Sequence, residues 1–113
     1  MNDREKNVHA SRKLLSDKRL TEFLYALKNR EHTHILAVKF ICNRLADGHT
    51  LDRIFYDGSD FGYNLTVRQT SENSFHVGFG CQVDPMAGDG GEWEVTFVGD
   101  QVEKISMCGH WIS

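Results

Sequence analysis

Proline and long apolar runs are the most obvious things that this sequence lacks. The chain of 113 residues has one proline, Pro85, and no apolar run near the roughly 20 residues that a membrane-spanning helix needs. Its first residues contain no apolar segment of the kind that marks a secretory signal. The three cysteines are an odd number at wide spacing, which is no disulfide framework. We therefore expect a cytoplasmic protein that does not enter a membrane.

Known catalytic and metal-binding motifs are also lacking. The acidic, glycine-rich stretch VDPMAGDGGEWEV at 83–95 is no calcium loop, because Pro85 and Met86 stand where oxygen ligands should follow Asp84. It has no Lys-Ser/Thr pair to bind phosphate, and no CxxC spacing suits a structural zinc ion. We therefore expect neither a metal nor another cofactor, and the sequence favours a non-enzymatic protein over an enzyme.

Basic residues are scarce in the second half of the chain. Residues 1–56 carry 11 Lys and Arg against 7 Asp and Glu, whereas residues 57–113 carry 2 against 9. Stacking platforms for nucleic acid need basic neighbours, and the second half offers only Arg68 and Lys104. The acidic half predicts a basic protein partner and disfavours nucleic-acid binding by this half.

The first half of the chain has helical periodicity. In what we expect to be a single domain over 1–113, residues 16–57 form the helical part, and 1–15 form either a weaker helix or a frayed arm. A first helix follows Ser16 or Asp17, and a second, strongly apolar helix runs between a Thr33 cap and Gly48. A short third helix is expected behind Thr50.

The second half alternates with a period of two. Apolar residues alternate with polar ones in four segments over residues 61–112, which predicts four antiparallel strands at 61–70, 74–83, 92–98 and 102–112. The predicted fold class is thus α+β, with two layers in which N-terminal helices pack on one face of a four-stranded antiparallel β-meander. Residues buried between the layers should include Phe40, Ile41, Phe79, Val95 and Phe97.

Face matching predicts the strand register. Directly paired residues must lie on the same face, which pairs Val67 with Val77 and Val95 with Ile105. Under this rule both hairpins need three-residue loops, at 71–73 and at 99–101. The connection between the middle strands is expected to be an eight-residue loop over 84–91.

The face of the sheet away from the helices should be polar. His76, Cys108 and His110 are expected on this face, where a thiol and an imidazole could bind a ligand or act as nucleophile and base. Gly78 and Gly80 leave part of it without side chains, which indicates strong curvature or close approach of another backbone.

Two functions lead at this point, ahead of a third in which the basic N-terminal helix docks on nucleic acid. The first is a protein-binding module of the inhibitor or immunity kind, whose acidic surface blocks a basic partner such as a nuclease or another nucleic-acid-handling enzyme. Its partner-binding residues would be acidic: Asp57, Asp60, Asp84, Asp89, Glu92 and Glu94. The alternative is a small ligand-binding or enzymatic domain with a pocket between helices and sheet, near His76, Cys108 and His110. In outline this arrangement is similar to the nuclear transport factor 2-like fold, and a filled core would favour the first function over the second.

Overall fold

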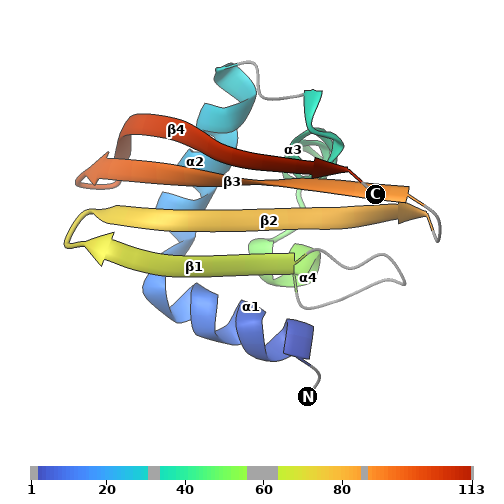
Figure 1. Cartoon of the computed structure of the whole chain (residues 1–113), viewed down its shortest axis with the longest axis horizontal. Coiled ribbons are helices and arrows are strands. Elements are labelled where there is room, and N and C mark those ends of the chain that lie inside the picture. The colour runs from blue at the N-terminus through green and yellow to red at the C-terminus, as the bar shows by residue number, and fades with distance from the viewer. Residues whose placement is uncertain (1–2, 31–33, 56–63, 85–86, 113) are drawn as a thin grey trace.

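The four helices precede a four-stranded sheet in the computed structural model of the chain (Figure 1). The structure describes residues 3–30, 34–55, 64–84 and 87–112. The helices are α1 (Asp3–Leu14), α2 (Asp17–Asn29), α3 (Leu36–Ala46) and α4 (Leu51–Phe55). The strands are β1 (Asn64–Ser71), β2 (Ser74–Asp84), β3 (Ala87–Val98) and β4 (Gln101–Ile112). The predicted α+β class is confirmed.

The helices begin where the local sequence favours a start. Ser16 caps α2 by accepting a hydrogen bond from the Arg19 backbone N–H at 3.2 Å, and Thr50 accepts from Arg53 at 3.1 Å before α4. Residues 3–14 are helical, which decides between the two alternatives left open for the N-terminal segment. Gly48, expected in a left-handed conformation after α3, has a φ of +89°. The expected Thr33 cap lies outside the described residues.

The sheet is an antiparallel meander in the order β1-β2-β3-β4. The predicted register is confirmed, because Val67 pairs with Val77 and Val95 with Ile105. The predicted three-residue loops were wrong. Both hairpins turn through two residues, at 72–73 and at 99–100, and each has a β-bulge nearby. The bulge inserts one extra residue, so the chain makes a tight turn and still keeps its apolar residues on one face.

The expected eight-residue loop over 84–91 was also wrong. β2 continues to Asp84 and β3 begins at Ala87, so residues 87–91 are paired with β2. Gly88, Gly90 and Gly91 would each weaken a strand taken alone. Here all three pair with β2, and Gly90 and Gly91 pair with β4 as well.

The space between helices and sheet is filled with side chains. Phe79 and Trp93 stack with ring centroids 5.0 Å apart, and Phe23 from α2 contacts both rings edge-on. Ile41, Val95 and Phe97 are buried as expected. Phe40 is only partly buried, because α3 turns a different part of its surface to the sheet, with Ala37, Val38, Ile41 and Cys42 facing inward.

α1 covers one edge of the sheet. The hydroxyl of Ser11, buried on α1, donates to the Leu65 carbonyl at 3.2 Å and accepts from the Val67 N–H at 2.9 Å. These bonds satisfy backbone groups of β1 that would otherwise face outward from an edge strand. The opposite edge belongs to β4, which carries exposed Met107, Trp111 and Ile112.

Candidate functional site on the outer face of the sheet

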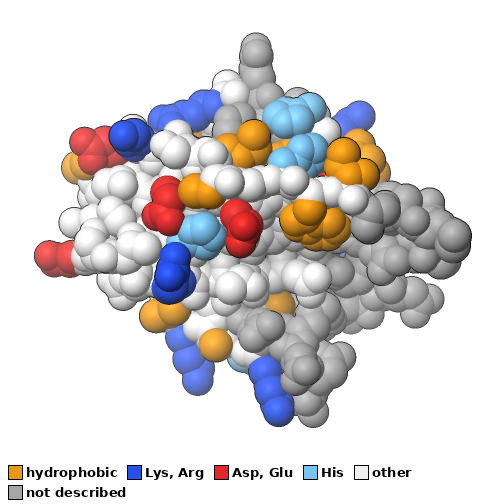
Figure 2. All heavy atoms as spheres, viewed as in Figure 1, with side chains coloured by type: hydrophobic (Ala, Val, Ile, Leu, Met, Phe, Trp, Pro, Cys, Tyr) orange, Lys and Arg blue, Asp and Glu red, His pale blue; other side chains and the backbone are white. Residues whose placement is uncertain are grey.

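The face of the sheet that the helices leave uncovered, called the outer face below, is turned to the viewer in Figure 2. Two cross-strand rows of residues make up its centre. One row runs Asn64, Gly80, Gly90 and Trp111, and the next runs Thr66, Gly78, Glu92 and Gly109. Four of these eight positions are glycine, so much of the centre of this face is bare backbone.

The glycines make room for the indole of Trp111. A Cβ atom built on Gly80 would lie 2.4 Å from the Trp111 ring, and one built on Gly90 would lie 2.5 Å from it. No side chain could be placed there without displacing the ring. We expected another backbone to approach these glycines, whereas the group that lies closest is the Trp111 side chain from β4, whose indole remains partly exposed.

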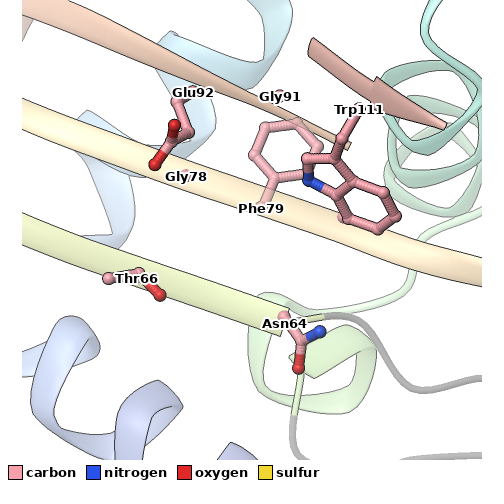
Figure 3. A pocket seen from close by; sticks show the side chains of 8 residues that line it. Asn64, Thr66, Gly78, Phe79, Gly91, Glu92 and Trp111 are labelled. Carbon is pink, nitrogen blue, oxygen red and sulfur yellow. The ribbon is translucent and has the colours of Figure 1, made fainter. Parts of the chain in front are cut away.

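A hollow of about 330 Å³ lies beside the indole. Figure 3 shows Glu92 on one side of it and Trp111 on the other, with Thr66 and Asn64 along β1. This volume is at the lower end of the roughly 300–1,000 Å³ typical of ligand pockets, which suits one side chain or a small fragment. The hollow is lined by Asn64, Thr66, Gly78, Phe79, Gly80, Gly91, Glu92 and Trp111.

Glu92 gives the hollow its charge. It is the one ionisable residue in the described lining, and its side chain is 56% exposed. Glu94, the other acidic residue of the described outer face that we expected to bind a partner, lies in the adjacent row between His76 and Ser106. Of the predicted partner-binding residues, these two lie on the outer face.

Asp89 has a different role from the one we predicted. It is buried, and its carboxylate accepts hydrogen bonds from the backbone N–H groups of Leu36 at 2.7 Å and Ala37 at 2.9 Å. These N–H groups are in the first turn of α3, whose own capping residue, Ile35, offers no side-chain bond. Asp89 therefore caps a helix and is not available to a partner. Asp57, Asp60 and the side chain of Asp84 lie outside the described residues.

The predicted cluster of His76, Cys108 and His110 is brought together only in part. A β-bulge at Cys108 shifts the register, so Gly109 pairs with Glu92, and His110 pairs with Gly91. His110 consequently leaves the outer face, and its ring contacts that of His34 at 5.6 Å between centroids. One inserted residue reverses the alternation of all residues that follow it, which explains the error. His76 and Cys108 do meet, together with Glu94.

The pocket expected between helices and sheet is not supported by the described residues. That space holds the aromatic core, and the hollow described above opens on the opposite side of the sheet. Among the described residues, no helix is long and apolar enough to cross a membrane. No known protein family, curated protein or solved structure shows a significant match to the chain.

Proposed function

We propose that this protein is a non-enzymatic binding module of the inhibitor or immunity kind, whose outer face takes a basic side chain of a partner protein into the hollow between Glu92 and Trp111. The observation that carries the proposal is that the Glu92 carboxylate and the Trp111 indole lie on opposite sides of a hollow whose base is formed largely by glycine backbone. A guanidinium or ammonium group in the hollow would meet the charge of Glu92 and lie against the indole of Trp111.

The lining argues for a cation over other ligands. An anion would meet the Glu92 charge with no basic residue among the described lining to offset it. A purely apolar group would desolvate Glu92, Asn64 and Thr66 without replacing their hydrogen bonds with water. Arginine fits both requirements, since its guanidinium is planar, stacks on aromatic rings and donates hydrogen bonds to carboxylates.

Charge also favours the half of the chain that forms the sheet as the contact with a basic partner. The N-terminal half has a net charge of +4 and the half that forms the sheet has −7. A basic partner would be steered toward the sheet. Nucleases and other nucleic-acid-handling enzymes present such basic surfaces. The proposed location is the cytoplasm, in keeping with three cysteines that are free thiols.

A titration followed by NMR tests the proposal. The probe is a short peptide with one arginine between glycines, and its matched control carries citrulline, which keeps the shape and removes the charge. We expect the arginine peptide to shift the amide signals of Gly78, Gly80 and Gly91 and the indole N–H of Trp111, and the citrulline peptide to leave them in place. A chelator in the buffer removes any contribution from metal ions.

Two variants distinguish a specific effect of the Glu92 carboxylate from a general effect of negative charge on the protein surface. Glu92→Gln should remove most of the response to the arginine peptide. Glu103→Gln, which neutralises an exposed glutamate of β4 outside the lining, should retain it. Shifts confined to other parts of the protein, or equal shifts with both peptides, would contradict the proposal.

A further inference from the structure

Three side chains with metal-binding atoms meet in the row of the outer face next to the hollow. His76 comes from β2, Glu94 from β3 and Cys108 from β4. One ligand atom from each lies within 4.8 Å of the other two. The nearest pair is His76 Nδ1 and a carboxylate oxygen of Glu94, 2.7 Å apart. The bulge at Cys108 helps to produce this arrangement by adding an extra residue to β4 at that point.

The other ring nitrogen of His76 also faces a carboxylate. Its Nε2 lies 3.4 Å from an oxygen of Glu92. A neutral imidazole has one N–H to donate, so it can bond only one of these two carboxylates. A metal ion at Nδ1 leaves the ring proton on Nε2, from which it can be donated to Glu92.

We propose that His76 Nδ1, Glu94 and Cys108 form a three-ligand site for a zinc-like transition-metal ion, and that Glu92 orients the imidazole through Nε2. Histidines that bind metals commonly donate their second ring N–H to a carboxylate, which fixes the ring and makes the ligand nitrogen more basic. The Glu92 contact supplies this partner independently of the three ligands.

The donor set and its spacing suit zinc. Imidazole, carboxylate and thiolate are the three protein ligand types of Zn²⁺, with bonds of about 2.0–2.3 Å, which places tetrahedral donor atoms roughly 3.6 Å apart. The His76–Glu94 pair is closer than this value, at 2.7 Å, and the other pairs lie within 4.8 Å, while the Glu94 and Cys108 side chains are exposed enough to adjust. Three protein ligands leave the fourth position to water. The site is distinct from the hollow, although Glu92 borders both.

Titration with Co²⁺ tests the site, because cobalt replaces zinc and reports its ligands by absorption. The wild-type protein, kept reduced with a phosphine, should develop the near-ultraviolet charge-transfer band of a thiolate–cobalt bond, and Zn²⁺ should abolish it. Cys108→Ser should lack the band although it retains Cys42 and Cys81. His76→Gln and Glu94→Gln should weaken Co²⁺ binding strongly, and Glu92→Gln by about 10- to 100-fold.

Matched controls come from the same strand. His110→Gln and Glu103→Gln remove a histidine and a glutamate of β4 outside the cluster, and both should bind Co²⁺ like the wild type. A second measurement guards against misfolded variants: Zn²⁺ should raise the melting temperature of the wild type and of both controls, but not that of Cys108→Ser. A band that is absent from the wild type, or that persists in Cys108→Ser, would overturn the proposal.

Discussion

Asp89 and Ala37, which are 52 positions apart in the sequence, are joined by a hydrogen bond of 2.9 Å from the Ala37 backbone N–H to the Asp89 carboxylate. The second carboxylate oxygen accepts from Leu36. A strand thereby supplies the cap of α3, and the negative charge lies at the positive end of the helix dipole.

Removal of this cap should destabilise the protein. Asp89→Ala leaves a buried N–H group on Ala37 and a part-buried one on Leu36 without their acceptor, and we expect the free energy of unfolding to fall by about 2–3 kcal/mol. Asp89→Asn keeps one acceptor and should lose roughly half as much. Asp47→Asn, which alters an exposed aspartate at the other end of α3, should stay within about 0.5 kcal/mol. Urea denaturation measures all three, and an Asp89→Ala protein as stable as the control would show that the cap is unimportant.

Arg19 on α2 holds the ends of both hairpins. Its guanidinium donates to the Gly99 carbonyl at 3.0 Å and to the Asn73 side chain at 3.1 Å, and lies 4.9 Å from the centre of the Phe97 ring. Arg19→Ala should lower the free energy of unfolding by about 1–3 kcal/mol. Arg19→Lys should recover little of this, because an ammonium cannot donate in the same fork while stacking on the ring. If Arg19→Lys were as stable as the wild type, the positive charge of Arg19 alone would explain its contribution.

The three thiols should differ in reactivity. Cys42 and Cys81 are buried and Cys108 is exposed. Burial raises the pKa of the Cys81 thiol to about 11, and the nearby Asp89 charge adds to the rise. A disulfide reagent at about pH 8 should therefore label one thiol in the native protein and all three in denaturant. Cys108→Ala should abolish the native labelling, and rapid reaction of a second thiol would contradict the packing around Cys81.

The same pKa predicts a pH dependence of stability. The folded protein keeps the Cys81 proton up to about pH 11, whereas the unfolded chain releases it near the ordinary value of 9.0. The stabilising contribution is thus complete below pH 9 and is lost as the pH rises toward 11. Over this window the wild type should lose stability more steeply than Cys81→Ala, as measured by urea denaturation at several pH values. Equal slopes would show that Cys81 titrates normally.

Substitution of a glycine that contacts Trp111, such as Gly80, should have a larger effect than substitution of Gly78. Gly80→Ala places a Cβ where the indole lies, whereas a Cβ on Gly78 meets the Glu92 side chain at an ordinary 3.4 Å. We expect Gly80→Ala to cost about 1–3 kcal/mol of stability and to move the indole. Iodide quenching of fluorescence reports the movement, since Trp93 is buried and Trp111 is accessible. Gly78→Ala should leave quenching unchanged, and an equal response in both variants would contradict the contact.

The sequence predicted the sheet register because face matching depends on pairs of apolar residues that are local to each hairpin. The turns were mispredicted because a β-bulge satisfies the turn and the register together, and an alternation pattern contains no signal for it. The bulge at Cys108 had the largest effect on the site, since it moved His110 off the outer face.

The remaining errors depend on partners distant in sequence. Residues 87–91 have the composition of a loop, and they form a strand because β2 pairs with them and β4 pairs with residues 89–91 on the other side. From the sequence, Asp89 is predicted to be an exposed acidic residue, and only its contact with α3 shows that it caps a helix. The sequence alone was enough to name Glu92 and Glu94 as candidate partner-binding residues. The contact between Trp111 and Gly80 could be found only once the order of the strands in the sheet was known.

A charge swap at Glu92 tests the central claim, which is that the hollow on the outer face selects a cation. The wild type should bind the arginine peptide in preference to an otherwise identical peptide with glutamate, and Glu92→Lys should reverse this preference. The measurement is the dissociation constant of each of the four combinations, taken from the Trp111 indole N–H signal at low salt. Reversal is the predicted result. A preference for arginine that survives in Glu92→Lys would contradict the account.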